Sequence, residues 1–215
     1  HALFCGLKAA PSYLAQLDIG DEARRDLMDA RQKVRSELRA AANAISLKDE
    51  YWQGEWSAAS KRSLRLRVEV KFMTQGSFAY KTINDPARLT QEIDLDDGMY
   101  VPVEFLDNGQ PALTAKGLFD FVVTALTPLA SREGWQGVVK KQNCVRVKLW
   151  DGAHLDIPIY SIPRDRFVQI TEALAKSFAD SKLTRTAMMD SYRLPPDKIM
   201  LARKDGTWIQ SDPQK

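Results

Sequence analysis

The spacing of apolar residues over 21–47 predicts one long amphipathic helix near the start of the chain. Leu27, Val34 and Leu38 recur at helical intervals, and Asp21 stands where a capping side chain is expected. Four arginines lie mostly on the other faces of this helix: Arg24, Arg31, Arg35 and Arg39. We expect them to form the solvated surface of a helix that packs through its apolar side.

Alternation of apolar and polar residues predicts the strands of a sheet. The segment 64–72, LRLRVEVKF, alternates strictly, and 92–104 has the pattern of a second strand with a break near Gly98. The segments 138–150 and 153–160 predict a hairpin, because Asp-Gly between two apolar runs favours a tight turn.

Proline and glycine mark the ends of several further elements. Pro158 should place its strand at a sheet edge, or itself near the strand end, because proline cannot donate to a ladder. A helix is predicted over 111–130 with Pro111 near its start, and another over 166–179. The polar stretch 180–198 is typical of a loop, and the segment IMLAR that follows it predicts a short strand.

Composition narrows the class of protein. The chain has 215 residues, of which 44% are hydrophobic and 27% charged, with a net charge of +3. A chain of this length buries enough apolar surface to form a core without disulfides or a structural metal. The two cysteines exclude a disulfide-rich secreted scaffold and a Cys-rich zinc site, and the two histidines nearly exclude a His-based metal site. No apolar run approaches the roughly 20 residues that cross a bilayer, and no signal peptide is visible, so we expect a cytoplasmic protein.

Two carboxylates in the second predicted strand carry the first chemical signal. Asp94 and Asp96 are two residues apart, so they point to the same face of a strand. Adjacent carboxylates repel each other unless cations neutralise them. Oxygen ligands of this kind suit Mg²⁺, which completes its shell with phosphate oxygens and water. A solvated strand edge is the competing interpretation of this pair.

Further residues complete a pattern for phosphoryl transfer. Gly76 allows close backbone approach to a phosphate, and Ser77 offers a hydroxyl at a predicted helix start, where the helix dipole favours anions. Asp156 lies on the polar face of the strand 153–160. Three strand carboxylates and a phosphate-binding turn are the parts of a two-metal site, although each residue alone is more typical of an ordinary turn or surface.

In this order and context the residues resemble the polymerase-β-like nucleotidyltransferases. Four segments are similar to the bacterial cGAS/DncV-like branch, and within it to the DncV-type cyclic dinucleotide synthases: TQGSFAY from Thr74, QEIDLDDGMY from Gln91, HLDIP from His154, and WIQSDP from Trp208. The similarity runs from about residue 70 to the end, and more loosely over the first helix.

The resemblance implies an α+β, polymerase-β-like fold with a mixed sheet flanked by helices. Residues 1–215 would form a single nucleotidyltransferase core: the long helix 21–47, the catalytic sheet and helices over 64–160, and the start of a second lobe over 161–215. The helical half that completes such enzymes is missing from the sequence, so we expect either a fragment or a separate partner chain. The ending Ser-Asp-Pro, which is typical of a helix start, also suggests a cut chain.

The resemblance also implies an enzyme that joins ATP, GTP or other nucleoside triphosphates into a cyclic di- or oligonucleotide messenger of anti-phage defence. A downstream effector would bind that messenger. By position, Asp94, Asp96 and Asp156 would bind Mg²⁺, with Mn²⁺ as a substitute. The nucleotide would be held by Gln75, Gly76, Ser77, Tyr80 and Arg146.

Two other functions remain open at this point. A nucleotidyltransferase that modifies an RNA, a protein or a small molecule would share the three aspartates. A catalytically silent nucleotide-binding module would be expected to have lost one of them, because the cluster is unfavourable without metal. Neither the net charge nor the few Cys and His residues indicate binding to double-stranded nucleic acid.

Overall fold

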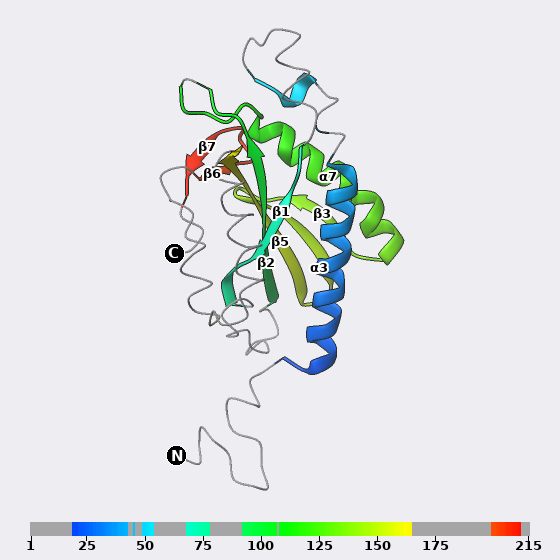
Figure 1. Ribbon diagram of the computed structural model, residues 1–215. Helices are drawn as coiled ribbons and strands as arrows, with labels where there is room; N and C mark the ends of the chain where they lie inside the picture. The colour runs from blue at the N-terminus through cyan, green and yellow to red at the C-terminus, as the bar shows by residue number, and fades with distance from the viewer. Residues whose placement is uncertain are drawn as a thin grey trace, which may run out of the picture.

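A computed structural model describes residues 19–42, 45, 49–53, 68–77, 92–106, 108–164 and 199–211. Its elements, labelled in Figure 1, are α3 (Asp21–Ala41), η1 (Asp49–Tyr51), β1 (Lys71–Thr74), β2 (Ile93–Val103), α7 (Ala115–Glu133), β3 (Gly137–Lys140), β4 (Cys144–Trp150), β5 (Ala153–Pro163), β6 (Met200–Ala202) and β7 (Trp208–Gln210). The predictions for 166–179 and 180–198 lie outside the described residues, and the second lobe expected within 161–215 stays a prediction.

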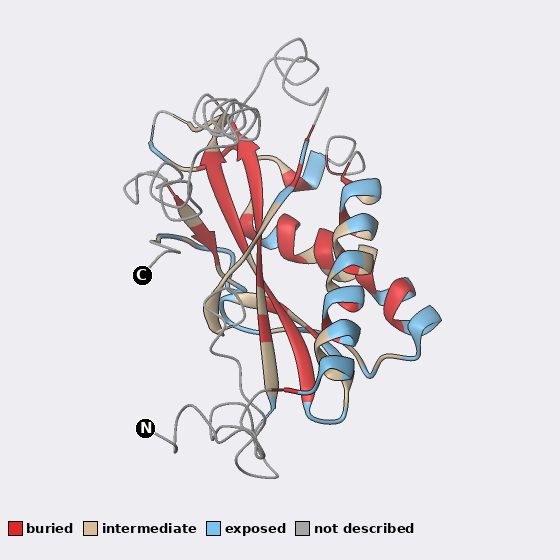
Figure 2. Ribbon diagram, turned by 60° about the horizontal axis from the view of Figure 1, so that its bottom comes forward, coloured by how far each residue is buried: buried red, intermediate tan, exposed pale blue. Residues whose placement is uncertain are grey.

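The strands form one mixed sheet, which confirms the expected fold class. Its order is β1-β2-β5-β4-β3, with β6 paired to β5 and β7 paired to β6. The two long strands, β2 and β5, are parallel neighbours at its centre, and the other pairs are antiparallel. Figure 2 shows both long strands largely buried, with α3 and α7 on the same side of the sheet.

The two helices bury the apolar faces that their sequences predict. Leu27, Val34 and Leu38 of α3 are fully buried. The predicted face of α7 is also buried, at Leu118, Phe119, Val122 and Leu126. The capping prediction for α3 is wrong: Gly20 is the N-cap, and Asp21 is the first helical residue, where its charge favours the positive end of the helix dipole. The helix ends at Ala41, before the predicted end at 47.

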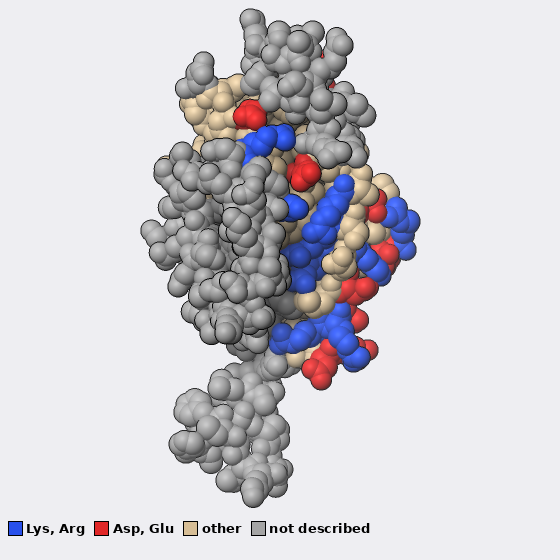
Figure 3. Space-filling view, in the orientation of Figure 1, with Lys and Arg blue, Asp and Glu red and all other residues tan. Residues whose placement is uncertain are grey.

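The prediction that the arginines of α3 are merely solvated is wrong for two of them. Lys and Arg side chains do gather along α3 in Figure 3. However, Arg31 and Arg35 both donate hydrogen bonds to Thr74 of β1, and Arg35 also binds Asp97 of β2. Arg39 lies over the ring of Phe72. The arginine face of α3 is therefore fastened to the edge of the sheet.

The first two strands differ from their predicted bounds in explicable ways. β1 begins at Lys71, whereas the alternating residues Val68 and Val70 are buried but precede the ladder; residues 64–67 lie outside the described residues. β2 is not broken at Gly98. A β-carbon there would lie about 3.0 Å from the ring of Tyr160, so the glycine permits close packing inside a continuous strand.

The predicted hairpin turn at Asp151-Gly152 is confirmed, and Gly152 has the positive φ of 79° that such turns require. The segment 138–150, however, divides into β3 and β4 at a turn where the Lys141 amide donates to the Cys144 carbonyl.

The prediction for Pro158 is wrong, since it lies in the middle of β5, a central strand. The structure accommodates it because Pro158 lies opposite Cys144, the first residue of β4. The ladder with β2 also skips this point, resuming at Met99–Ile159 after Asp96–Asp156.

Near α7 the predicted helix start differs from the observed one by a few residues, and near β6 the predicted strand is confirmed. The helix begins at Ala115 rather than at Pro111, because Thr114 caps it by accepting a hydrogen bond from the Gly117 amide. The predicted IMLAR strand is confirmed as β6, which forms a hairpin with β7. Among the described residues, no helix has the length and apolar character needed to traverse a membrane.

Candidate active site

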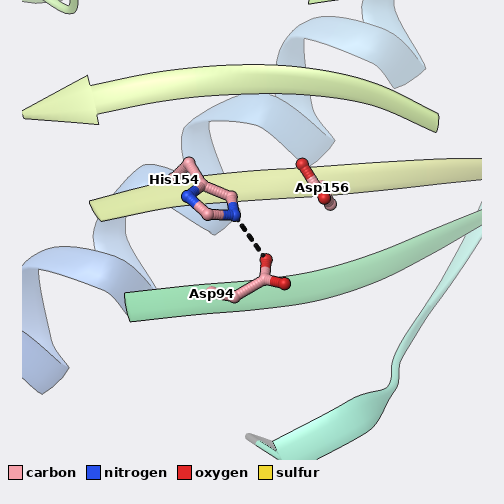
Figure 4. Close-up of side chains that lie close together, drawn as sticks. All are labelled: Asp94, His154 and Asp156. Carbon is pink, nitrogen blue, oxygen red and sulfur yellow. Dashed lines mark ion pairs between the residues drawn. The ribbon is translucent and has the colours of Figure 1, made fainter. Parts of the chain in front are cut away.

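The register of the two central strands assembles the predicted carboxylates. Asp94 of β2 lies opposite His154 of β5, and Asp96 lies opposite Asp156. Because alternate residues of a strand share a face, these four side chains belong to one face of the sheet. Figure 4 shows Asp94, His154 and Asp156 converging from the two strands. The tertiary structure thus brings Asp156 to Asp94 and Asp96, which lie about 60 residues earlier in the sequence.

Arg146 of β4 holds Asp156 in a bidentate ion pair. Its Nε donates to Oδ1 and its Nη2 to Oδ2, each at 2.7 Å. Asp156 is only 7% exposed, and paired hydrogen bonds of this kind fix a carboxylate in both position and plane. The same contact raises the pKa of Arg146. The predicted nucleotide ligand Arg146 therefore touches the predicted metal ligand directly.

His154 lies between two carboxylates. Its Nε2 is 3.0 Å from Oδ1 of Asp94, and its Nδ1 is 2.8 Å from Oε2 of Glu92. These separations fall within hydrogen-bond distance. Even so, both ring nitrogens and Asp94 Oδ1 are buried atoms without a well-oriented hydrogen-bond partner among the residues that the structure describes. Burial and the nearby Arg146 lower the pKa of His154.

Asp96 lies against the turn that carries the glycine and serine. Its backbone carbonyl accepts from the Gln75 amide at 2.9 Å, and a β-carbon at Gly76 would overlap its Oδ2. Gly76 also has a positive φ of 60°. A glycine is therefore required here to make room for Asp96. The sequence predicted this glycine for a different reason, the close approach of the backbone to a phosphate. As predicted, Ser77 is at a helix start, since Gly76 and Ser77 are helical.

The side chain of Gln75 is used inside the protein. Its Nε2 donates to the hydroxyl of Tyr100 at 2.8 Å, and its Oε1 accepts from the hydroxyl of Tyr160 at 3.3 Å. The two tyrosine rings are stacked, with centroids 4.8 Å apart. Burial raises the pKa of both phenols, that of Tyr160 to about 12, so both hydroxyls stay protonated. The Gln75 side chain is thus held by two tyrosines and its backbone amide by Asp96, and its contact with a triphosphate stays a prediction.

Asp94 and Asp96 of β2 resist ionisation. Burial, reinforced by Asp156 and other carboxylates nearby, raises the pKa of Asp94 to about 6. Burial, and to a smaller extent the charges of Asp94 and Asp156, also raises the pKa of Asp96 to about 6. The thiol of Cys144, on the same face of β4 as Arg146, has its pKa raised to about 12 by burial and by Asp156. Such crowding of negative charge on a half-buried face is typical of a cation site.

The donors on this face fit a divalent cation. Donor atoms of Asp94, His154 and Asp156 all lie within 4.8 Å of one another, and Asp94 Oδ1 is buried without a hydrogen bond. Carboxylate oxygens suit Mg²⁺ and Mn²⁺. Asp96 lies outside that group of donors, over Gly76, but interacts electrostatically with both other aspartates. Tyr80, the remaining predicted residue, lies outside the described residues.

Sequence reasoning overlooked three residues of this region. His154 could have been found, because it lies two residues before Asp156 on the same strand face. Glu92, the first residue of the predicted strand, gave no signal of its own. Asp97 gave none either, because its role depends on α3: it is 1% exposed and paired with Arg35.

Comparison with known proteins places this site in a family. Residues 70–160 match the family model described as "Cyclic GMP-AMP synthase DncV-like, nucleotidyltransferase domain". A cyclic GMP-AMP synthase of Vibrio cholerae is 35% identical over 162 residues, which is 69% of this chain and 37% of the relative. This chain therefore spans little more than a third of that relative's length.

Solved structures show the same likeness. The V. cholerae di-nucleotide cyclase DncV in complex with GTP and 5MTHFGLU2 superimposes with a TM-score of 0.71 at 26% identity, covering 94% of this chain and 58% of that one. The same V. cholerae protein in complex with the linear intermediate 5′ pppA(3′,5′)pG gives 0.66 at 25% identity, with coverage of 94% and 57%.

Proposed function

This chain belongs, through residues 70–160, to the DncV-like nucleotidyltransferase family, and we propose that it is the catalytic core of an enzyme that joins nucleoside triphosphates into a cyclic di- or oligonucleotide. One observation carries the proposal. Asp94, Asp96 and Asp156 share one face of two adjacent parallel strands, beside the turn formed by Gly76 and Ser77. In-line phosphoryl transfer requires such a cluster of cation ligands next to an anion-binding turn.

The three aspartates would hold Mg²⁺, or Mn²⁺ in its place. The bound cations would supply charge neutralisation at the phosphates and acidification of the attacking ribose hydroxyl. Ser77 and the backbone amides at the helix start would bind the donor triphosphate, because backbone N–H groups and the helix dipole favour anions there. Little protein acid–base chemistry is needed, which agrees with a sequence containing two histidines.

Arg146 would have two roles in this scheme. Its bidentate pairing with Asp156 fixes that carboxylate and offsets part of the local negative charge. Arginine also binds phosphate through the same planar fork of donors. We infer that Arg146 shifts toward the triphosphate when Asp156 binds a cation. Tyr80 is proposed to contact the nucleotide by resemblance alone.

The relatives suggest the substrates. Structures of the V. cholerae enzyme contain GTP and a linear adenosine–guanosine intermediate, so we propose ATP and GTP as substrates here and a linear dinucleotide as the first product. We further propose a cytoplasmic role in anti-phage defence, in which a downstream effector binds the cyclic product. A complete enzyme would include the helical half that the resemblance implies, in this protein or in a partner chain.

Incubation of the full protein with all four radiolabelled triphosphates and Mg²⁺, followed by phosphatase treatment and mass analysis, tests the proposal. We expect a phosphatase-resistant cyclic product that is lost in Asp94→Asn and in Asp96→Asn. Asp151→Asn, in the exposed turn before β5, is the matched control and should retain activity.

The outcomes separate the candidate functions. A linear or acceptor-linked nucleotide would favour the non-cyclising transferase. Nucleotide binding without any product, in the presence of the helical half, would favour the silent module. Normal activity in Asp94→Asn, with a folded protein, would refute the assignment of the metal ligands.

A further inference from the structure

We propose that His154 is a nitrogen ligand of a divalent cation held with Asp94 and Asp156, and that this site prefers a transition-metal ion such as Mn²⁺ to Mg²⁺. The inference rests on the proposed function for the presence of a cation at this face. It adds a ligand, and a metal preference, that the three aspartates alone do not imply.

The burial of His154 is the first argument. The residue is 5% exposed, and Figure 4 shows its ring directed from β5 toward Asp94, beside Asp156. Neither ring nitrogen has a well-oriented hydrogen bond among the described residues. Burying polar atoms without partners is costly, and a bound cation would satisfy Nε2 of the ring and Oδ1 of Asp94 together.

Glu92 supplies the second argument. A histidine that binds a metal through one nitrogen usually presents the other N–H to a carboxylate, which fixes the tautomer and the ring orientation. Oε2 of Glu92 lies 2.8 Å from Nδ1 of His154, close enough for this role once the two groups are aligned as a hydrogen bond. With the proton on Nδ1, the Nε2 lone pair faces Asp94 Oδ1 at 3.0 Å. Two facing acceptors repel each other unless a cation lies between them.

The separations agree with shared coordination. Metal bonds of about 2.1 Å place adjacent octahedral ligands about 3 Å apart, and Nε2 of His154 is 3.0 Å from Oδ1 of Asp94. Together with Asp156, all three donor atoms lie within 4.8 Å of one another. A small inward movement of the side chains would therefore enclose one ion.

The donor set determines the metal preference. Mg²⁺ favours oxygen ligands and keeps its water, whereas imidazole suits transition metals. Two carboxylates with one imidazole therefore favour Mn²⁺ over Mg²⁺ more than three carboxylates do. Loss of the nitrogen ligand should weaken Mn²⁺ binding about tenfold or more, while Mg²⁺ binding changes much less.

The test uses the full, untagged protein loaded with Mn²⁺ alone and electron spin echo envelope modulation, which detects nitrogen bound to Mn²⁺. Residues 1–215 contain two histidines, His1 and His154, and labelling with [¹⁵N]histidine restricts the signal to histidine nitrogen. We expect ¹⁴N modulation in unlabelled protein, its replacement by ¹⁵N modulation on labelling, and its loss in His154→Gln. His1→Gln is the matched control and should keep the modulation. The comparison of labelled and unlabelled wild type does not depend on a variant that folds.

Titration calorimetry with Mn²⁺ and Mg²⁺ completes the test. Mn²⁺ binding that shows no histidine nitrogen coupling would overturn this inference and leave the proposed function intact. Equal losses of Mn²⁺ and Mg²⁺ affinity in His154→Gln would overturn the metal preference. Absence of any Mn²⁺ binding, or of its loss in Asp94→Asn, would overturn the cation site of the proposed function itself.

Discussion

Arg35 of α3 holds both carboxylate oxygens of Asp97 on β2. Its Nε donates to Oδ2 at 2.7 Å and its Nη2 to Oδ1 at 2.5 Å. Asp97 is 1% exposed and directly follows Asp96. The strand that carries two proposed metal ligands is thus fixed from its opposite face by the long helix. The acidic run of β2 divides between the two faces: Asp94 and Asp96 belong to the site, and Asp97 belongs to the scaffold.

Removal of the Asp97 carboxylate should destabilise the fold and disturb the site. Asp97→Ala leaves the Arg35 charge partly buried and unpaired, and breaking a buried pair in this way costs about 3–5 kcal/mol. Urea unfolding should show this loss, whereas Asp26→Ala, at an exposed position of α3, should change the free energy of unfolding by less than about 0.5 kcal/mol. Similar stabilities for the two variants would contradict the structural role of Asp97.

Gly76→Ala should abolish nucleotidyl transfer. The substitution adds strain of about 1–2 kcal/mol at a positive φ and also forces the new methyl group into Oδ2 of Asp96. Gly152→Ala is a matched control, because Gly152 has φ 79° but open space around a β-carbon. We expect comparable backbone strain in both variants and loss of activity in Gly76→Ala alone. Retained activity in a folded Gly76→Ala protein would show that Asp96 can move without consequence.

The raised pKa values of Asp94 and Asp96, about 6 each, predict a pH-dependent stability. The folded protein binds these protons more tightly than the unfolded chain does. Their stabilising contribution is therefore full below the unfolded pKa of about 4 and is lost as the pH rises through about 6. In EDTA, the melting temperature of Asp94→Asn/Asp96→Asn should rise relative to that of wild type as the pH increases from 4 to 7. Adding Mg²⁺ or Mn²⁺ at pH 7.5 should reduce this difference, and a difference independent of pH would be inconsistent with strained carboxylates.

Cys144 should be an unreactive thiol whose reactivity reports on Asp156. Its pKa is raised to about 12 by burial and by that carboxylate, so little nucleophilic thiolate is present at pH 8. In a Cys5→Ser background, alkylation by iodoacetamide should be slow in the native protein and faster after Asp156→Asn, which removes the opposing charge. The rate of alkylation can be followed by intact mass. An unchanged rate in Asp156→Asn would show that burial alone suppresses the thiol.

The sequence by itself determined the chemistry and most of the elements. Asp94 and Asp96 are two residues apart, and because side chains alternate along a strand, this spacing placed both carboxylates on one face. Helical spacing identified the buried side of α3, and the Asp-Gly turn before β5 followed from its need for a positive φ. These features depend on local geometry, which neighbouring residues fix.

Only the tertiary structure decided which distant residues meet. The parallel register of β2 and β5 brought Asp156 to Asp96 and His154 to Asp94, across about 60 residues of sequence. The tertiary structure also placed Pro158 inside a central strand, where the ladder omits its position. It paired Arg35, expected at the surface, with a buried carboxylate. Strand order and register arise from the packing of both helices on one sheet face, a long-range balance of apolar burial and charge pairing that no local pattern contains.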